Sequence, residues 1–513
     1  MPRLTNLGHV FRLTRAGFVL AREGAFVDLD RSTLPPFARL PLLLANLLAR
    51  GGMHGFSGLA AAVDRLGPSY VKLGQFLATR PDIVGPRVAI ELEKLQDRMT
   101  PVDRASAVAA VEAAFGAPID SLFVEFGEPV AAASIAQVHK ARVRDAAGER
   151  DVAVKLVRPG VERRFARDLS DMFYAARSAE RFEPRLRRLR LIEVVETLAR
   201  SVKVEMDFRL EAAAASEFAE NLADDPGFRA PKIDWDRTTR TALTMEWIDG
   251  TPLSDPARLA ELGFDAPKLA RSLIQSFLRH ALRDGFFHAD MHQGNFFVDA
   301  EGRIVAIDFG IMGRLGRKER RFLAEILYGF IRRDYRRVAE VHFEAGYVPA
   351  THRVEDFAQA IRAVGEPIHA RTADQISMAK LLTLLFEITG LFDMSTRIEL
   401  VMLQKTMVVV EGVARKLDPH LDMWATAEPV VGGWIAENLS PRGRIEDVGS
   451  AFAQLGRLLI DAPEQLERIS RRLEASGDWR TERPAEPPRA GISVPAALWA
   501  IVGILLFLAY HFS

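Results

Sequence analysis

The fold is decided by His288-Ala289-Asp290-Met291-His292-Gln293-Gly294-Asn295, which is followed at a short interval by Asp308-Phe309-Gly310. Asn295 lies five positions after Asp290, the spacing of phosphoryl-transfer loops in which the aspartate orients or deprotonates the nucleophile and the asparagine holds magnesium. Asp308 offers a second hard oxygen ligand, suited to a magnesium ion that bridges two phosphates. We therefore predict Asp290 as a catalytic residue and Asn295 and Asp308 as metal ligands.

The interval between the two stretches predicts a β-hairpin. Residues 295–299 and 303–307 have strand character, and residues 300–302 supply the turn. Antiparallel pairing would bring Asn295 and Asp308 to the same edge of the hairpin. The alternative is an acidic hairpin on a surface, and the motifs upstream argue against it.

Composition bounds the remaining possibilities. The chain has 513 residues, of which 48% are hydrophobic, so it can form two or three domains or one large bilobal domain. Lysine plus arginine equal aspartate plus glutamate, 68 against 68, so there is no basic field for nucleic acid and none is predicted as a partner. The absence of cysteine excludes disulfides, thiolate metal sites and cysteine nucleophiles. Residues 1–28 lack the apolar core of a secretory signal.

A β-rich section precedes the catalytic stretch. Residues 123–126 and 138–143 are predicted strands, and the alanine-rich residues 127–137 are predicted to form a loop between them. The next strand, residues 152–157, carries Val-Ala-Val-Lys, the third-strand pattern of protein kinases whose lysine contacts the α- and β-phosphates. Lys155 is that lysine, and it needs an anionic nucleotide and a carboxylate as partners.

Residues 241–250 form a further predicted strand that runs into a glycine turn, as in a hinge between two lobes where backbone groups meet an adenine. The residues predicted to bind the cofactor are therefore Ala131, Ala132, Ala133, Ser134, Ile135, Ala136, Gln137, Val138, His139, Lys140, Lys155, Met245 and Glu246.

Two helical segments carry further charged groups. Residues 68–81 are predicted to form a helix between two prolines, with Lys72 and Gln75 on its polar flank; a solvated face is the alternative. Residues 204–213 are predicted to be helical, so that Asp207 and Glu211 share one face while Glu205 points elsewhere. One of these acids can pair with Lys155, and another can reach a second cation.

The C-terminal half is predicted to be rich in helices from residue 253 to about residue 473. Only residues 311–316 separate Gly310 from a helix that starts near Arg317, so there is no room for the activation segment of a protein kinase. Residues 494–512 are apolar, uncharged and long enough for one transmembrane helix, with arginines before it that place the catalytic part in the cytoplasm. Residues 40–50 are apolar but shorter, which favours a core helix over an interfacial segment.

Between about residues 67 and 419 the chain resembles the UbiB family of atypical protein-kinase-like ATPases, associated with ubiquinone biosynthesis. The resemblance rests on motifs that occur jointly and in order: Lys72-Leu73-Gly74-Gln75, Ala131-Ala132-Ala133-Ser134, Val152-Ala153-Val154-Lys155, Glu205-Met206-Asp207, His288-Ala289-Asp290, Asn295, Asp308-Phe309-Gly310 and Glu411-Gly412.

The resemblance implies that the Lys72 helix folds over the active site, with Lys72 meeting Glu205 or Asp207, and that Lys155 pairs with Glu211. These residues join Asp290 as predicted catalytic residues. It also implies hydrolysis of ATP with Mg²⁺, coupled to the handling of lipid quinone precursors or of ubiquinone biosynthetic proteins.

The sequence departs from the family at two places. Met291 and Gln293 stand where the family usually has prolines, which could loosen the catalytic loop, and Ala214 stands where it usually has asparagine. Two other functions compete with the ATPase: a kinase for a small molecule or a prenyl lipid, and a nucleotide-gated lipid-binding scaffold with negligible turnover.

We therefore expect an α+β, bilobal protein-kinase-like fold with an N-terminal helical extension and a C-terminal transmembrane helix, anchored by one pass in a bacterial-type inner membrane. The predicted domains are an N-terminal helical, membrane-proximal region (1–63), an N-lobe (64–250), a helical C-lobe (251–476), a polar linker (477–493) and the transmembrane helix (494–513).

Overall fold

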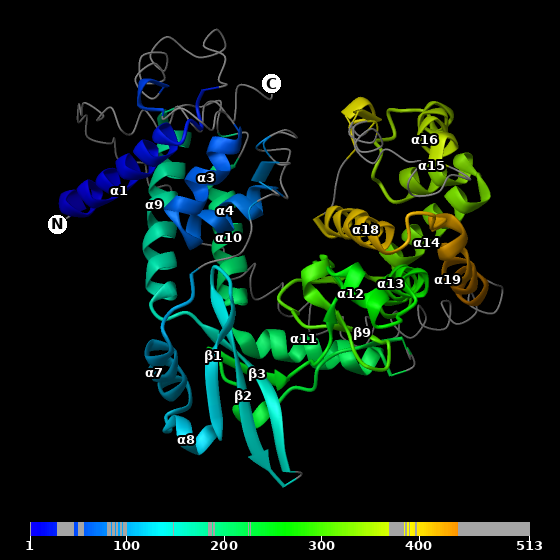
Figure 1. Ribbon diagram of the computed structural model, residues 1–513. Coiled ribbons are helices and arrows are strands. Elements are labelled where there is room, and N and C mark those ends of the chain that lie inside the picture. Colours follow the sequence, from blue (N-terminus) through cyan, green and yellow to red (C-terminus); the bar gives the residue numbers. More distant parts are fainter. Residues whose placement is uncertain are drawn as a thin grey trace, which may run out of the picture. The chain divides into compact units, whose positions relative to one another are not determined.

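The structure is a computed structural model (Figure 1). It describes residues 2–27, 46–49, 56–78, 84, 88, 91–92, 95, 100–146, 148–182, 187, 190–223, 225, 227–368, 384, 387–388, 390–394 and 398–439. These residues form two compact units. The first unit contains the described residues up to Gly250 together with Phe297–Gly310, and the second contains Thr251–Phe296 and the described residues from Ile311 onward. The domain limits proposed from the sequence stay predictions.

The first unit combines helices with an antiparallel sheet. Its helices are α1 (Pro2–Arg22), α3 (Phe56–Leu66), α4 (Pro68–Ala78), α7 (Arg104–Phe115), α8 (Ile119–Leu122), α9 (Val161–Phe182), α10 (Leu191–Glu205) and α11 (Phe208–Asn221). Its main sheet has the order β1 (Glu125–Ala132), β2 (Ala136–Asp145), β3 (Gly148–Val157) and β5 (Ala242–Glu246). All three pairings are antiparallel, and the predicted α+β class is confirmed.

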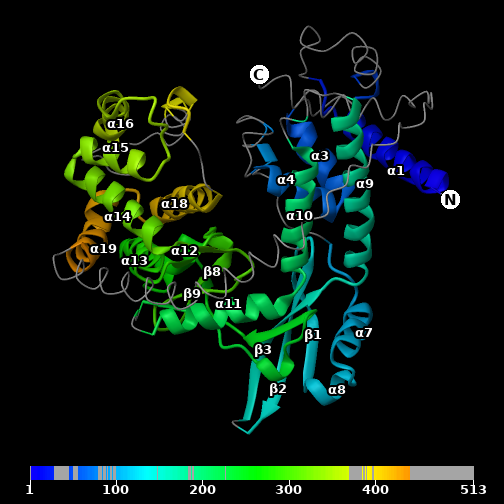
Figure 2. The same ribbon diagram turned by 180° about the vertical axis from the view of Figure 1, so that it is seen from behind.

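Helices cover both faces of this sheet (Figures 1 and 2). On one face, Val152, Val154 and Leu156 of β3 pack against Ala107 and Val111 of α7. On the other face, residues of β3 and β5 share a core with α9, α10 and α11. Because successive side chains of a strand point to opposite faces, the residues between the buried valines of β3 are directed toward α10 and α11.

The predicted hairpin is confirmed. Strands β8 (Phe296–Val298) and β9 (Ile304–Ala306) are neighbours in a small sheet, in which β9 also pairs in parallel with β4 (Phe228–Arg229). Asp299 N donates to Arg303 O at 3.0 Å, and Gly302 has φ of +77°, a conformation that favours glycine. The hairpin lies between Asn295 and Asp308 in the chain, as the sequence predicts, and the meeting of these two residues at one edge stays a prediction.

The second unit is mostly helical, which confirms the prediction for its described residues. Its helices are α12 (Pro256–Glu261), α13 (Ala266–Arg279), α14 (Arg317–Arg332), α15 (Tyr335–Glu344), α16 (Val354–Ile368), α18 (Ile398–Leu417) and α19 (Met423–Asn438). A short π-helix, His280–Asp284, follows α13. Two strands, β7 (Phe286–His288) and β10 (Met312–Arg314), pair antiparallel, and a 3₁₀ turn spans Gln293–Asn295.

Two predicted elements differ from the structure. The predicted loop 127–137 is mostly strand, because β1 continues to Ala132 with irregular register against β2. The predicted helix 204–213 is broken: α10 ends at Glu205, and Asp207 caps α11 by accepting from Arg209 N. Asp207 and Glu211 therefore do not share a helical face. Aspartate competes with helix continuation because its side chain bonds nearby backbone groups, which makes it a good N-cap.

The membrane predictions fall largely outside the described residues, as do the linker 477–493 and the span 494–513. Within the described ranges, no helix has both the length and the apolar character that crossing a bilayer requires. Leu47 and Leu48 are 76% and 47% exposed, so the predicted burial of residues 40–50 as a core helix is wrong for these two. An apolar run predicts burial only where another element packs on it.

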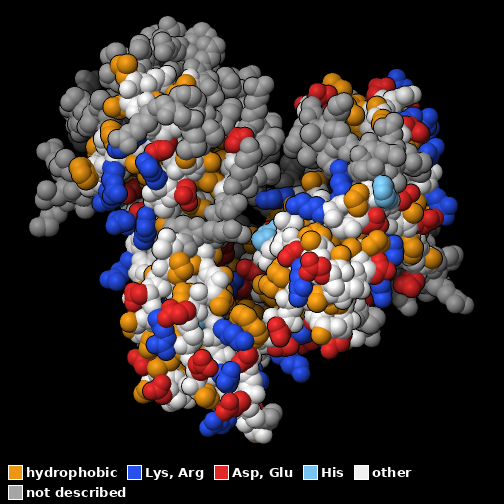
Figure 3. Space-filling view, in the orientation of Figure 1, with side chains coloured by type: hydrophobic (Ala, Val, Ile, Leu, Met, Phe, Trp, Pro, Cys, Tyr) orange, Lys and Arg blue, Asp and Glu red, His pale blue; other side chains and the backbone are white. Residues whose placement is uncertain are grey.

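On the face shown in Figure 3, acidic and basic side chains are interspersed over both units.

The pairing of β7 with β10 leads to a first testable prediction. A Cβ atom on Gly313 would lie 2.2 Å from Cζ of Phe287, a fully buried ring that packs edge-on against Phe277. We expect Gly313→Ala to destabilise the protein by about 1–3 kcal/mol, because overpacking forces the ring or the strand to shift. Gly433→Ala is the control, since nothing lies within 4 Å of its added Cβ in α19, and it should be neutral or stabilising. Thermal unfolding of both variants tests this prediction. Equal unfolding midpoints for Gly313→Ala and Gly433→Ala would contradict it.

Candidate active site

Lys155 stands between two carboxylates in the first unit. In the sheet, Lys155 of β3 is paired with Leu243 of β5. The side chain of Leu243 belongs to the core shared with α10 and α11. Lys155 Nζ donates to Glu211 Oε1 at 2.6 Å and to Asp308 Oδ2 at 3.2 Å. The Lys155–Glu211 pair implied by the family resemblance is therefore present, and Asp308 joins it.

Helix α11 and Phe309 fix this arrangement. Glu211 lies on the buried stripe of α11, together with Phe208 and Phe218. Phe309 packs against Phe218 with ring centroids 5.6 Å apart, and its backbone N donates to Glu211 Oε1 at 3.4 Å. Because Phe309 is held on α11 by its ring and its amide, the preceding Asp308 is placed beside Lys155.

The three charged groups carry one negative charge more than positive when all are ionised. Burial alone would lower the pKa of Lys155, but the carboxylates of Asp308 and Glu211 outweigh it and raise that pKa. Burial raises the pKa of Glu211, and Asp308 adds to the effect while Lys155 opposes it. The cluster thus favours an additional cation, and a divalent ion held by the half-exposed carboxylate of Asp308 fits this requirement.

The raised pKa of Glu211 predicts a pH effect on stability. Between the unfolded pKa of about 4.5 and the raised native value, the folded state binds more protons than the unfolded state, so stability falls as pH rises. We expect Glu211→Gln to remove part of this fall above about pH 4.5. Urea unfolding at several pH values measures it, with Glu196→Gln, an exposed carboxylate of α10, as control. The same pH slope in parent and Glu211→Gln would contradict the assignment.

The alanine-rich segment is a tight turn between two paired strands. Ala131 and Ala132 pair with Val138 and Gln137, and Ala133 N donates to Ala136 O at 2.7 Å. Arg158 closes the turn from outside, because its Nη1 donates to Ala133 O at 3.1 Å. None of these residues has positive φ, so the turn is built without the conformations that glycine would permit.

Gln137 and His139 belong to the interior of this sheet. Both side chains are fully buried, and Gln137 Nε2 lies 2.8 Å from His139 Nε2. His139 Nδ1 bonds Gly127 O at 2.9 Å, its ring stacks on Phe126, and burial lowers its pKa. These hydrogen bonds thus give the polar groups of Gln137 and His139 partners within the sheet. Lys140 instead points outward and pairs with Asp151 at 2.7 Å.

Met245 and Glu246 end β5 at the predicted hinge. Met245 is buried and pairs with Ala153, and Glu246 N donates to Lys232 O at 2.8 Å. The Glu246 carboxylate pairs with Arg229 at 3.0 Å. The contact of this segment with an adenine stays a prediction.

Lys72 pairs with Glu205 rather than with Asp207. Lys72 Nζ lies 2.5 Å from Glu205 Oε2, and the two side chains are 13% and 16% exposed. Asp207 instead receives two bonds from Arg209, which lower the pKa of Asp207. Of the two partners that the family resemblance implies for Lys72, the structure therefore shows Glu205.

The catalytic stretch forms a bonded loop in the second unit. Asn295 Nδ2 donates to Asp290 O at 3.0 Å and lies 3.4 Å from Asp290 Oδ2. Asp290 N donates to His288 Nδ1 at 3.1 Å, and His292 Nε2 lies 3.8 Å from Asp290 Oδ2. The carboxylate of Asp290 is 43% exposed, so it remains accessible to a substrate. The side-chain nitrogen Nδ2 of Asn295 faces Asp290. The side-chain oxygen of Asn295, the atom that would bind a metal, therefore points away from Asp290.

Met291 and Gln293, which stand where the family usually has prolines, are held by other contacts. Met291 is 1% exposed and fills the interior, and Gln293 accepts from Lys416 Nζ at 3.2 Å. Thr406 Oγ1 lies 3.0 Å from Ala289 O, just before Asp290. Two residues of α18 thus contact this loop, and the loosening inferred from the missing prolines stays a prediction. Sequence reasoning missed Thr406 and Lys416, because no local motif marks a contact across so many residues.

The described residues contain no group of three or more histidine, aspartate or glutamate side chains arranged to hold a metal by themselves. Magnesium in phosphoryl-transfer sites is bound through one or two protein ligands together with phosphate oxygens and water. The donor set of Asp308 and Asn295 is of that kind, and their roles as ligands stay a prediction.

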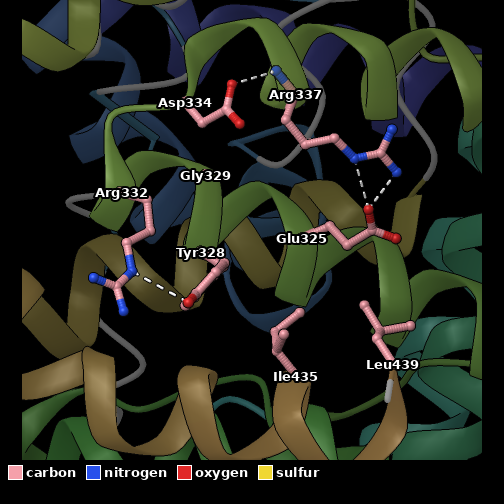
Figure 4. A pocket seen from close by; sticks show the side chains of 8 residues that line it. All are labelled: Glu325, Tyr328, Gly329, Arg332, Asp334, Arg337, Ile435 and Leu439. Carbon is pink, nitrogen blue, oxygen red and sulfur yellow. Dashed lines mark hydrogen bonds and ion pairs between the residues drawn. The ribbon is translucent and has the colours of Figure 1, made fainter. Parts of the chain in front are cut away.

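A cavity of about 290 Å³ lies elsewhere in the second unit (Figure 4). It is lined by α14, the start of α15 and the end of α19, through Glu325, Tyr328, Gly329, Arg332, Asp334, Arg337, Ile435 and Leu439. Both of its acidic residues contact Arg337: Glu325 pairs with the Arg337 guanidinium group, and Asp334 Oδ1 accepts from Arg337 N at 3.0 Å. None of the residues predicted to act on a nucleotide lines it.

Comparison with known proteins gives consistent matches. Residues 94–342 match the family model of the ABC1 atypical kinase-like domain, and residues 361–422 match the UbiB helical domain. The chain is 39% identical over 481 residues to the probable protein kinase UbiB of Marinobacter nauticus, covering 92% of this chain and 87% of the relative. It is 40% identical over 417 residues to the protein of the same name from Pseudomonas putida, covering 80% and 77%.

A solved structure, that of the complex of Rv3197 with erythromycin from Mycobacterium tuberculosis, is 24% identical with a TM-score of 0.47, covering 77% of this chain and 97% of that one. The family resemblance drawn from the motifs is confirmed by the two family models and by relatives that the chain matches over most of their length. The chain belongs to the UbiB family of ABC1 atypical kinase-like proteins.

Proposed function

We propose that this chain is an ATPase of the atypical kinase-like type that supports ubiquinone biosynthesis. The observation that carries the proposal is Lys155, 13% exposed and held between Glu211 and Asp308 in a cluster with excess negative charge. A lysine so placed can contact nucleotide phosphates, and the surplus carboxylate can hold the magnesium that accompanies them. The link to quinone precursors rests on family membership.

Each predicted residue then has a distinct role. Lys155 contacts the phosphates, with Glu211 orienting its ammonium group. Asp308 and Asn295 would hold magnesium, which would neutralise charge at the phosphates. Asp290 orients the attacking water or hydroxyl, since its carboxylate is exposed while its backbone is fixed on both sides.

The short segment after Gly310 bears on the acceptor. Residues 311–316 contain β10, which pairs with β7, and α14 begins at Arg317. A segment of this length lacks room for a platform that binds a protein substrate. Water, a small molecule or a prenyl lipid remain as acceptors, so a small-molecule kinase is the alternative.

Product analysis tests the proposal. Purified protein incubated with magnesium-ATP should release ADP and inorganic phosphate in equal amounts. Release of ADP without phosphate, with label on an added prenyl lipid or small molecule, would favour the kinase. No ADP above the level of Asp290→Asn would favour a nucleotide-gated scaffold.

We further propose that residues 494–513 anchor the protein in the inner membrane, with the catalytic part in the cytoplasm. The support is the length and apolar composition of that segment. Deleting residues 494–513 should move much of the protein from the membrane pellet to the soluble fraction. A deletion variant that pellets as completely as the parent, after washing at high salt, would contradict the anchor.

A further inference from the structure

One helix of the second unit holds the catalytic loop on both sides of Asp290. Thr406 of α18 is 1% exposed, and its Oγ1 lies within bonding distance, 3.0 Å, of Ala289 O. Lys416, near the end of α18, donates from Nζ to Gln293 Oε1 at 3.2 Å. Ala289 immediately precedes Asp290, and Gln293 follows it by three positions.

The backbone, rather than side-chain contacts, sets the position of Asp290. Its carboxylate is 43% exposed and lies 3.4 Å from Asn295 Nδ2 and 3.8 Å from His292 Nε2, distances too long for strong bonds. The peptide that joins Ala289 to Asp290 is held at its N–H, because Asp290 N donates to His288 Nδ1 at 3.1 Å. The preceding peptide is held by Ala289 N, which donates to Ile311 O at 3.0 Å. Thr406 supplies the partner for the carbonyl oxygen of Ala289.

The hydroxyl of Thr406 has a second acceptor within reach. Met402 O, one helical turn earlier, lies 2.8 Å away, the usual internal bond of a threonine in a helix. A hydroxyl has one proton, so it is shared between Met402 O and Ala289 O. The helix does not depend on this proton, because Met402 O is also within the helical ladder of α18. The contact with Ala289 is the one that a loss of the hydroxyl would leave without a substitute.

We propose that Thr406 is a positioning residue for Asp290, and that Lys416 is a second, weaker anchor of the same loop. The catalytic consequence rests on the proposed ATPase function. The helical segment matched to the UbiB helical domain is then part of the catalytic unit, because it fixes the backbone from which the catalytic carboxylate projects. Loss of the Thr406 hydroxyl lets the Ala289 peptide rotate, and a displacement of about 1 Å at the carboxylate can cost on the order of 100-fold in rate.

The test uses variants of nearly equal shape in the full-length protein. Thr406→Val removes the hydroxyl while keeping the volume, and Thr406→Ser keeps the hydroxyl. Thr426→Val is the matched control: Thr426 is also buried, and its Oγ1 donates to Asp422 O, one turn earlier at the start of α19. We expect Thr406→Val to lower kcat roughly 10- to 100-fold with KM for ATP within about twofold of the parent. Thr406→Ser and Thr426→Val should retain parental kcat.

A second readout does not depend on turnover. Amide hydrogen exchange of a peptide covering residues 289–296 should accelerate in Thr406→Val and not in Thr426→Val, at equal thermal midpoints. If the parent hydrolyses no ATP, the proposed ATPase function fails while the exchange result still decides the anchoring. Lys416→Met, at an exposed position, should accelerate exchange of the same peptide less strongly, and it keeps the test decisive if Thr406→Val does not fold. Unchanged exchange in both variants, or equal kcat for Thr406→Val and Thr426→Val, would overturn the proposal.

Discussion

Replacing Asp308 with asparagine is expected to abolish the stabilisation that magnesium-ATP gives to the protein. The carboxylate of Asp308 is the exposed member of the Lys155 cluster, and its Oδ1 also accepts from Gly310 N at 2.9 Å. Asparagine keeps the shape and loses the charge. It therefore removes the surplus negative charge that attracts a divalent cation and leaves Lys155 balanced by Glu211 alone.

The size of the effect follows from binding linkage. At a nucleotide concentration about 100 times Kd, a ligand that binds only the folded state stabilises it by about 2.7 kcal/mol, which is several degrees in Tm for a protein of this size. The parent should show this shift with magnesium-ATP and a smaller one with ATP and a chelator. Asp308→Asn should show no dependence on magnesium. Glu301→Gln, an exposed acid in the hairpin β8–β9, is the matched control and should behave like the parent.

Asp290→Asn separates binding from chemistry. Because Asp290 is predicted to act on the nucleophile and not on the metal, its variant should keep the magnesium-dependent shift while turnover falls by roughly 10²–10⁴-fold. Normal stabilisation of Asp308→Asn by magnesium-ATP would remove Asp308 from the metal site. Loss of that stabilisation in Asp290→Asn would show that the two roles had been assigned to the wrong residues.

Much of the candidate site could be predicted from local sequence, because its spacing reflects local geometry. The hairpin between Asn295 and Asp308 follows from two short strands and a glycine turn, and Lys155 follows from strand alternation in β3. Helix α4 begins at Pro68, as its fixed φ predicts, and α14 begins at Arg317.

Other local features could not be predicted from the sequence, because the same residue type occurs in two different kinds of local structure. Asp207 fits a helical pattern by spacing, yet aspartate also caps helices, and here it starts α11. The alanine-rich segment was predicted as a loop, since alanine is a weak strand former. Pairing of Ala131 and Ala132 with β2 overrides that preference, because strand propensity depends on context more than helix propensity does.

Contacts between distant segments could not be predicted at all without the family resemblance. The bond from Thr406 to Ala289 joins residues 117 positions apart, and threonine in a helix usually bonds within its own helix. Phe309 is recognisable as part of a motif, but its bond to Glu211 depends on how α11 packs. The sequence shows which groups carry charge, and tertiary packing decides which of them meet.

The pair between Lys72 and Glu205 gives the second large effect. Glu205 is the last residue of α10, where the partial negative charge of a helix end disfavours an acid. Its placement is therefore not explained by the stability of α10, and Lys72 on α4 is the group that offsets its charge. Helix α4 packs through Tyr70, Leu73 and Phe76 on the core that also contains residues of α10, α11 and β3. The ion pair thus fixes α4 on the same core that supports Lys155.

We expect Lys72→Ala to change phosphate release or self-phosphorylation several-fold without unfolding the protein, and to fail to support quinone synthesis in cells. Removing the ammonium group leaves the half-buried Glu205 with only Ser201 as a bonding partner among its described contacts, which loosens α4 while its apolar contacts remain. Arg209→Ala is the control, because it breaks the Asp207–Arg209 ion pair in the same region without touching α4. The exchanged pair Lys72→Glu with Glu205→Lys should recover part of the parental activity if the contact itself matters. If Lys72→Ala matches the parent in phosphate release, self-phosphorylation and complementation, the Lys72–Glu205 ion pair has no functional role.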